Sequence, residues 1–259
     1  MGPLILVEPL MRGVSMVVLA RPEQRNALSI DLLEQLCTAV ESLAGQPDQR
    51  VIILRGAGPV FSAGLDLREA ADDAHVERSA ASVGRALELL RQTPLVSIAA
   101  VHGGAYAGGA GLMATCDIVI AADDAKFGFP EARRGLLPAL VCKTLRSRIR
   151  EGDLRDLLLT GEIITASRAL HVGLVQRVVP SDQLIAEARR VAEQILDGGP
   201  ETIRQTRKLL NQIFEGEPGL SERHLDELHL AARRGDEARE GLAAFSEKRA
   251  PSWSRERIP

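Results

Sequence analysis

Two glycine-marked segments, residues 61–67 (FSAGLDL) and residues 103–111 (GGAYAGGAG), carry the strongest chemical signal in the chain. Each follows an apolar run typical of a β-strand and leads toward a helical pattern. Glycine lets a ligand approach the main chain closely, so both segments can present backbone N–H groups. Two such groups aimed at one point stabilise a carbonyl oxygen that becomes negative during a reaction. We predict that the amides of Ala63 and Gly108 form such an oxyanion hole.

Both segments also have purely structural interpretations. Asp66 could brace the first loop or cap the turn that follows it. Residues 109–114 fit the loose dinucleotide pattern GxGxxA, but that pattern should directly follow a strand, and the preceding apolar run already ends at Val101. We therefore predict no dinucleotide site. An amide at Gly108 would instead be reinforced by the positive end of the short helix expected after it.

A third segment, residues 126–135 (KFGFPEARRG), offers a separate acid or base. Pro130 favours the start of a helical turn, with Glu131 at its front. Burial among the neighbouring aromatic residues would raise the pKa of Glu131 toward the range of a general base, whereas a helix N-terminus would lower it. The sequence does not decide between these effects. The alternative is a surface glutamate paired with Arg133 or Arg134.

The elements that must position these segments alternate along the first part of the chain. Apolar runs predict strands at residues 14–20, 51–54, 96–101, 118–122 and 175–179. Helical patterns are predicted at residues 29–43, 76–90, 110–114, 139–149, 153–160, 166–171, 182–197, 200–214, 221–231 and 236–248. This order indicates an α/β core followed by a helical C-terminal section. The polar tail carries Trp253, which is either loose or packed on the body or a neighbouring subunit.

Composition narrows the class of protein. The chain has 259 residues, of which 45% are apolar, so one large domain with a full core is the default. A net charge of -3 and 3% aromatic residues give no drive toward nucleic acid or an anionic membrane. The three cysteines and five histidines lack the spacing of a disulfide framework or a metal site. The first residues lack the plan of a signal peptide, so we expect a cytoplasmic protein.

In their order and spacing, the three segments together resemble the crotonase (enoyl-CoA hydratase/isomerase) family. The resemblance begins at residues 21–28 (RPEQRNAL), includes FGFPE at 127–131, and continues through ASRAL at 166–170 and GLV at 173–175. It implies an α/β fold, a crotonase-like spiral of ββα units with a helical C-terminal region. Residues 1–200 would form a core that binds acyl-CoA, and residues 201–259 would build a homotrimer or a dimer of trimers.

The resemblance also implies an acyl-coenzyme A thioester as substrate, with no further cofactor and no metal. Ala63 and Gly108 would hold the thioester carbonyl as it becomes an enolate, and Glu131 would move the proton. The implied contacts with the CoA and acyl parts come from Arg25, Ala27, Ser62, Gly64, Leu65, Asp66, Tyr106, Gly109 and Gly111. Arg68, Lys208 and Lys248 are weaker candidates for the CoA phosphates.

One position departs from the family pattern. Hydratases of the family commonly use a second glutamate, which would fall at Gly111 and is missing here. We therefore predict a hydratase with Glu131 as its single acid/base. Double-bond isomerisation, decarboxylation of a malonyl-type thioester and non-catalytic acyl-CoA binding are the alternatives. Because glycine has no side chain, we also expect free space at position 111 that could admit a branched or carboxylated acyl group, with Arg133 and Arg134 as candidate partners for a carboxylate.

Overall fold

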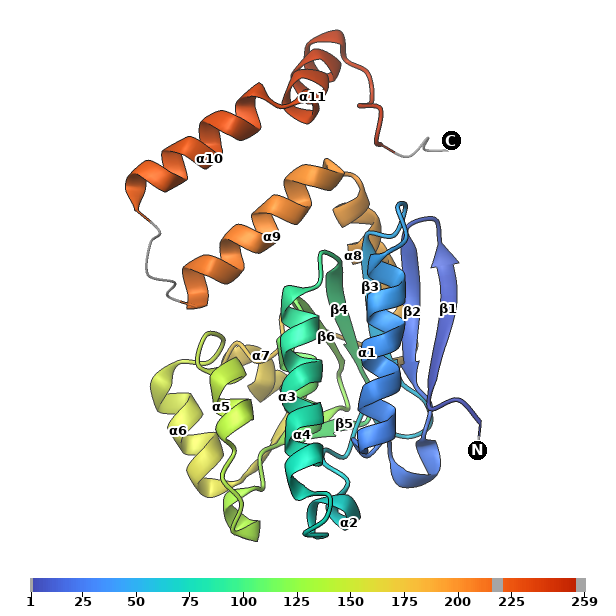
Figure 1. Cartoon of the computed structure of the whole chain (residues 1–259), viewed down its shortest axis with the longest axis vertical. Coiled ribbons are helices and arrows are strands. Elements are labelled where there is room, and N and C mark those ends of the chain that lie inside the picture. The colour runs from blue at the N-terminus through green and yellow to red at the C-terminus, as the bar shows by residue number, and fades with distance from the viewer. Residues whose placement is uncertain (1, 216–220, 255–259) are drawn as a thin grey trace. The chain divides into compact units, whose positions relative to one another are not determined.

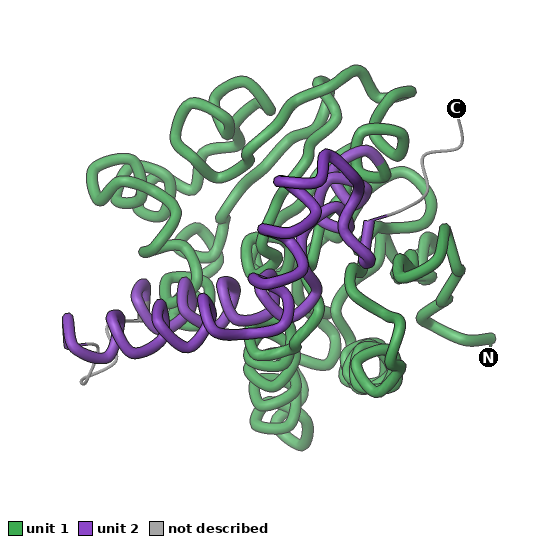
Figure 2. The backbone as a smooth tube through the Cα atoms, turned by 90° about the horizontal axis from the view of Figure 1, so that it is seen from above, with its two compact units in different colours: residues 1–189 green, residues 190–259 purple. Residues whose placement is uncertain are grey.

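The computed structural model describes residues 2–215 and 221–254, which fall into two compact units (Figure 2). Unit 1 is Met1–Arg189 and unit 2 is Arg190–Pro259. The boundary lies inside helix α8 (Leu184–Leu196), earlier in the chain than the boundary predicted after residue 200. The predicted combination of an α/β core with C-terminal helices is confirmed.

Unit 1 is built on a sheet that has six strands within the described residues, in the order β1-β2-β3-β4-β6-β9 (Figure 1). The strands are β1 (Ile5–Met11), β2 (Val14–Leu19), β3 (Val51–Gly56), β4 (Val96–Val101), β6 (Ile118–Ala122) and β9 (Arg177–Val179). Only β1 pairs antiparallel; the other neighbours are parallel. The continuous burial of β2 and β4 fits a parallel sheet covered on both faces. The five predicted strands are confirmed, the last being shorter than expected, and β1 is an addition.

Helices α1 (Ile30–Ala44) and α3 (Val76–Gln92) run side by side next to this sheet (Figure 1). Helix α1 begins as predicted, because the Ser29 side chain accepts a hydrogen bond from the Leu32 N–H. Its apolar residues recur on one side of the helix and are buried: Ile30, Leu32, Leu33, Leu36, Cys37, Val40 and Leu43. The sheet and these two helices therefore form the core that carries the loops.

A second, smaller sheet contains β5 (Gly104–Tyr106), β7 (Lys126–Gly128) and β8 (Ile163–Thr165), in that order. Strand β7 is parallel to β5 and antiparallel to β8. An isolated bridge between Ser62 and Ala105 attaches the first glycine-marked loop to β5. The sequence did not predict these strands, since three residues are too short to show a period of two. This small sheet nevertheless gathers all three chemically interesting segments.

The remaining elements of unit 1 are short. The helices are α2 (Leu67–Ala70), α4 (Gly108–Thr115), α5 (Ala139–Leu145), α6 (Glu151–Thr160) and α7 (Ala166–His171). Single 3-10 turns occur at Pro22–Gln24, Ala132–Arg134 and Ser181–Gln183. Helix α4 begins two residues earlier than predicted, so Gly108 lies in its first turn.

Unit 2 contains α9 (Pro200–Glu215), α10 (Glu222–Arg234) and α11 (Asp236–Glu247). The carboxylate of Glu237 accepts hydrogen bonds from the N–H groups of Glu201 and Thr202, which joins α11 to the start of α9. The indole N–H of Trp253 donates to the Asp197 carbonyl at 3.3 Å. The tail is therefore folded back as far as residue 254, and the prediction of a loose tail is wrong there. Within the described residues, no helix combines the length and the apolar character that a membrane crossing requires.

Candidate active site

The loop at residues 57–66 is shaped by the buried side chain of Asn26. This side chain is fully buried, and its amide group donates to the carbonyls of Ala57, Val60 and Phe61 at 2.8, 2.9 and 3.1 Å. Asn26 itself has a positive φ of 52°, a conformation that asparagine tolerates better than most residues. One side chain thus joins the segment before α1 to the first glycine-marked loop.

Two further polar side chains brace the same loop. The Ser62 hydroxyl donates to the Asn26 carbonyl at 2.8 Å and accepts from the Gly64 N–H at 3.2 Å. The Asp66 carboxylate binds the Arg21 guanidinium at 2.6 Å and accepts from the Arg68 N–H at 3.1 Å, where α2 begins. Both predicted structural roles of Asp66 are therefore confirmed. The side chains of Ser62 and Asp66 thus form hydrogen bonds with other parts of the protein that hold this loop in place.

The pKa of Asp66 reflects this bracing. Burial of the carboxyl group raises its pKa, but the hydrogen bond and charge of Arg21 and the N–H groups at the start of α2 outweigh that effect. The pKa of Asp66 consequently lies below its usual value. Asp66 is thus held as a carboxylate that organises the loop.

The backbone amides of the first loop differ from the prediction. The Ala63 N–H donates to the Arg25 carbonyl at 2.9 Å, so the prediction that it is free to bind a substrate oxygen is wrong. Within the described part of the chain, the Leu65 N–H has no acceptor. Gly64, with a φ of 91°, lies between the two and turns the chain. The available amide is therefore two residues later than predicted.

The Gly108 amide lies next to that of Leu65. A Cβ atom placed on Gly108 would be 3.8 Å from the Leu65 nitrogen, and the Gly108 N–H has no acceptor among the residues described. Ala107, just before it, has φ 49° and ψ −126°, and its N–H donates to the Gly128 carbonyl at 2.9 Å. Such a conformation is strained for a residue with a Cβ atom and is typical of functional sites. The structure thus brings together two unpaired amides, one of them in the first turn of α4.

Close approach of the two glycine-marked segments requires the absence of side chains. A Cβ atom on Gly109 would lie 2.6 Å from Ser62 Oγ, and one on Gly64 would lie 2.6 Å from the Tyr106 carbonyl oxygen. The Tyr106 ring packs along the small sheet, where a Cβ atom on Gly104 would lie 2.9 Å from the phenolic oxygen. These contacts place Ser62, Gly64, Tyr106 and Gly109 in one cluster.

Glu131 lies three residues beyond the end of β7 and is 7% exposed. Its Oε2 is buried and has no hydrogen-bond partner among the described residues. Burial raises the pKa of Glu131 above its usual value, against the weaker opposing effects of its own backbone and the charge of Arg134. This settles the balance that the sequence left open. The alternative of a surface ion pair is wrong, since Arg133 instead donates to the Thr160 carbonyl at 2.8 Å.

The expected free space at Gly111 is occupied. A Cβ atom on Gly111 would lie 3.1 Å from Val141 Cγ2 and 3.8 Å from both Val141 Cβ and Cγ1. Val141 belongs to α5, which packs against α4, and it is 5% exposed. The prediction of an empty space for a branched or carboxylated acyl group is therefore wrong. No sequence pattern indicated Val141, because the contact joins two helices and cannot be inferred from the sequence of either helix alone.

The basic residues that are candidates for the CoA phosphates belong to both units of the chain. Arg25 and Arg68 are exposed and flank the first loop, and Arg25 has a positive φ of 51°. The Ala27 carbonyl accepts from the Arg21 guanidinium at 3.2 Å, which holds this stretch to the loop. Lys208 and Lys248 belong to unit 2 and remain predictions.

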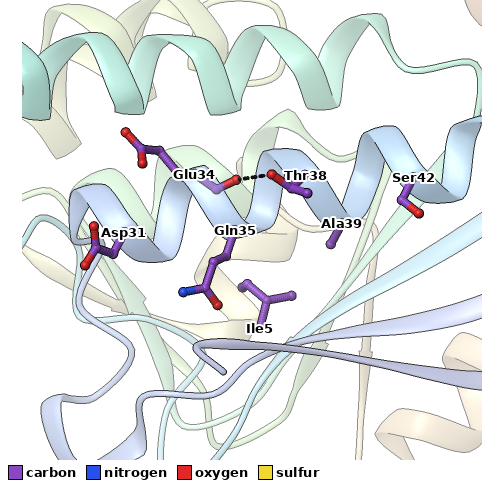
Figure 3. A pocket seen from close by; sticks show the side chains of 7 residues that line it. All are labelled: Ile5, Asp31, Glu34, Gln35, Thr38, Ala39 and Ser42. Atoms are coloured by element: carbon purple, nitrogen blue, oxygen red, sulfur yellow. Dashed lines mark hydrogen bonds between the residues drawn. The ribbon is translucent and has the colours of Figure 1, made fainter. Parts of the chain in front are cut away.

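A separate hollow of about 570 Å³ lies between α1 and the start of β1 (Figure 3). Ile5 and a row of mostly polar side chains on α1, including Glu34 and Gln35, line it. The Gln35 side chain accepts from the Leu4 N–H, and Glu34 pairs with Arg78. None of the residues that line it belongs to the loops described above, so this hollow is not the candidate site.

The family model described as enoyl-CoA hydratase/isomerase matches residues 10–256. The chain belongs to the enoyl-CoA hydratase/isomerase, or crotonase, family. It is 38% identical over 253 residues to a probable enoyl-CoA hydratase, EchA8, of Mycobacterium bovis, covering 96% of this chain and 97% of that protein. It is 36% identical over 264 residues to the enoyl-CoA hydratase EchA19 of Mycobacterium tuberculosis, covering 97% of both.

Solved structures of this family agree with the fold. AtuE of Pseudomonas aeruginosa superposes with a TM-score of 0.91 at 32% identity, covering 98% of this chain and all of that one. An enoyl-CoA hydratase of Mycobacterium smegmatis superposes with a TM-score of 0.90 at 31% identity, covering 97% and 99%. The crotonase fold is thereby shown, and the protein is an enoyl-CoA hydratase/isomerase family enzyme.

Proposed function

We propose that the protein adds water to a 2-enoyl-CoA thioester and that Glu131 is the acid and base of the reaction. The observation that carries this proposal is the buried carboxylate oxygen of Glu131, which has no hydrogen-bond partner among residues 2–215 and 221–254. A buried polar atom without a partner is costly, so it is kept where a bound group completes it. Relatives named as enoyl-CoA hydratases support the same choice of reaction.

The oxyanion hole in this proposal consists of the Leu65 and Gly108 amides, with Leu65 replacing the predicted Ala63. Both amides lack an acceptor among the described residues and lie close to each other. They would donate to the thioester oxygen as it becomes an enolate oxygen. Each such donor contributes about 3 kcal/mol to the stability of a transition state.

One carboxylate can complete the proton balance of hydration. Glu131 takes a proton from water while the water oxygen bonds to C3, and the electron pair of the double bond moves toward the thioester oxygen. The enolate then collapses and C2 takes the same proton back from Glu131. The raised pKa of Glu131 suits both steps, because it brings the carboxyl group closer to the working pH, where one group can both accept and return a proton.

For the CoA part, we propose that Arg25 and Arg68 face the phosphates. Both guanidinium groups are exposed beside the loop that carries Leu65. Arginine is well suited to phosphate because its planar group donates two parallel hydrogen bonds. Ala27, Gly64 and Gly109 would contribute by leaving the backbone accessible or closely packed.

A second candidate reaction is isomerisation of a 3-enoyl-CoA to a 2-enoyl-CoA. The observation that favours it is Val141, which gives position 111 an apolar neighbour instead of a carboxylate that could hold water. In this reaction Glu131 removes a proton from C2, and the resulting enolate takes the proton back at C4. Isomerisation consumes no water, so an apolar surface near the Glu131 carboxylate is compatible with this reaction.

Turnover separates these reactions. We would supply crotonyl-CoA and a 3-enoyl-CoA to the wild type and to Glu131→Gln, and follow water addition, double-bond position and CO₂ release. Water addition that is lost in Glu131→Gln supports the first proposal, and double-bond migration supports the second. Full activity in Glu131→Gln would refute the assigned base. CoA-thioester binding without turnover across a broad acyl panel would refute both reactions.

For assembly, we propose the homotrimer or dimer of trimers that the family resemblance implies. Apolar side chains of α9 and α10 that are exposed in the single chain support it: Leu210, Ile213, Phe214, Leu225, Leu228 and Leu230. Light scattering on the purified protein would measure the mass. The cytoplasmic location also stays a prediction, which fractionation of the source cells would test.

A further inference from the structure

Helix α5 is held over α4 by contacts at Gly111 and one turn beyond it. Val141 lies over Gly111 itself, one turn before the place where the hydroxyls of Thr115 and Thr144 approach to 3.5 Å. The Thr115 hydroxyl also donates to the Gly111 carbonyl at 2.9 Å. Leu145, one turn after Val141 on α5, is fully buried. The position of Val141 is therefore set by helix packing.

This position lies near both parts of the proposed site. Gly111 is three residues beyond Gly108 on α4, so the two share one side of the helix. Cys142, the neighbour of Val141, is close enough to Glu131 that the carboxylate adds to the effect of burial in raising the pKa of the thiol. Helix α5, which carries Val141, therefore lies close to both α4 and the Glu131 turn.

We propose that Val141 determines the acyl selectivity of the enzyme. The inference rests on the proposed function, because it needs the acyl chain to lie between Gly108 and Glu131. The isopropyl group of Val141 packs against the position that a side chain at 111 would take, and it presents carbon atoms there. Val141 therefore limits the width of the acyl group near C3, so straight acyl chains are preferred over branched ones.

The experiment compares crotonyl-CoA with its β-branched analogue, 3-methylcrotonyl-CoA. The variants are Val141→Ala, which widens the space, and Gly111→Ala, which narrows it by placing a methyl group 3.1 Å from Val141 Cγ2. The double variant combines them. Leu145→Val is the packing control, because it removes one carbon from a buried side chain of the same helix, one turn away from Val141.

Val141→Ala removes two methyl groups and should shift the ratio of kcat/KM toward the branched thioester by at least about tenfold, the lower end of the effect of one methylene in an apolar pocket. Gly111→Ala should shift it the other way, and the double variant should return toward the wild type. Leu145→Val should lower the melting temperature without changing the ratio. An unchanged ratio in a folded Val141→Ala, or an equal change in Leu145→Val, would overturn the proposal.

A binding measurement separates this proposal from the reaction itself. The rise in melting temperature with each thioester reports selectivity without turnover. If the wild type turns over neither thioester but Val141→Ala still gains binding of the branched one, the reaction is wrong and the role of Val141 stands. If both thioesters are turned over and neither readout changes in Val141→Ala, the role of Val141 is wrong and the reaction stands.

Discussion

Asp66 and Glu131 are both buried carboxyl groups in loops of the same site, but they have opposite surroundings. The Asp66 side chain is 8% exposed and bound to Arg21 at 2.6 Å. Glu131 is 7% exposed, and its Oε2 has no partner among the residues described. Accordingly, the pKa of Asp66 is lowered and that of Glu131 is raised. Burial raises the pKa of both carboxyl groups, but only Asp66 has a cationic partner that outweighs it, so Asp66 holds the loop and Glu131 can move a proton.

The partner of Asp66 lies far away in the chain, since Arg21 precedes it by 45 residues. Glu131, in contrast, has arginines two and three residues after it, and yet Arg133 donates to the Thr160 carbonyl. At both positions, therefore, the neighbours in the sequence do not show which charged group the carboxylate pairs with. The following variants test whether the two carboxyl groups have separate roles, beginning with the largest expected effect.

Glu131→Gln should lower kcat/KM by about 10²–10⁴-fold, because it removes the group that accepts and returns the proton. Steady-state turnover of the preferred enoyl-CoA measures this loss. The matched control is Glu162→Gln, since Glu162 is exposed and immediately precedes β8 of the same small sheet. A loss of activity in Glu162→Gln as large as that in Glu131→Gln would show that charge, and not a proton carrier, is what matters.

Asp66→Asn should destabilise the fold by about 3 kcal/mol at pH 7, since it leaves the Arg21 charge buried without its partner. The pKa of Asp66 is lower in the folded state than its ordinary 3.8, so its stabilisation is complete above that pH. It is lost as the pH falls through the folded value. Urea unfolding of wild type and variant should therefore show a deficit at pH 7 that narrows below pH 4. A deficit that is equal at both pH values would argue against the ion pair.

Much of the scaffold was predictable from sequence. The runs at residues 51–54 and 96–101 are wholly apolar and bounded by polar segments, so they indicated buried strands, which β3 and β4 confirm. The Ser29 cap predicted the start of α1. These features are local, since each depends on the residue types within one element. The glycine content of two segments, and the order of all three segments along the chain, also indicated which parts of the sequence form the site.

The finer geometry was not predictable, because it depends on contacts between distant segments. The chain turns at Gly64, so the backbone amides of Ala63 and Leu65 have different surroundings. The Ala63 amide is occupied because it donates to the carbonyl of Arg25, a residue from a distant segment. The small sheet is built from strands of three residues. The wall over Gly111 comes from Val141, a residue of another helix. None of these contacts between distant segments can be inferred from a single sequence.

Glu131→Gln should also stabilise the protein at neutral pH, by about 1 kcal/mol, although it slows turnover. The folded pKa of Glu131 is raised, so keeping it ionised costs stability above that pKa. The cost disappears as the pH falls through the raised pKa toward the ordinary value of 4.5. Denaturation of wild type and variant at pH 7 and pH 4.5 measures the difference. The sign is opposite to that of Asp66→Asn, and equal signs would contradict the comparison.

Ala107→Gly should have the smallest effect and tests the link between the two regions. Ala107 contacts the first loop, since a Cβ atom on Gly64 would lie 3.0 Å from the Ala107 Cβ, and its N–H binds the Gly128 carbonyl before the Glu131 turn. Its φ of 49° with ψ −126° costs alanine about 1–3 kcal/mol. Glycine removes this strain but adds freedom to the unfolded chain, which costs about 0.5–1 kcal/mol.

We therefore expect a net gain of about 1 kcal/mol in the free energy of unfolding of Ala107→Gly. Ala80→Gly, on the exposed side of α3, measures the glycine cost alone and should lose about 0.5–1 kcal/mol. The difference between the two variants isolates the strain at Ala107. If Ala107→Gly gains stability and also loses part of its kcat, the strained residue holds the Gly108 amide in place for the reaction. If it loses as much stability as Ala80→Gly, no strain is stored there, and the two regions are joined by ordinary packing.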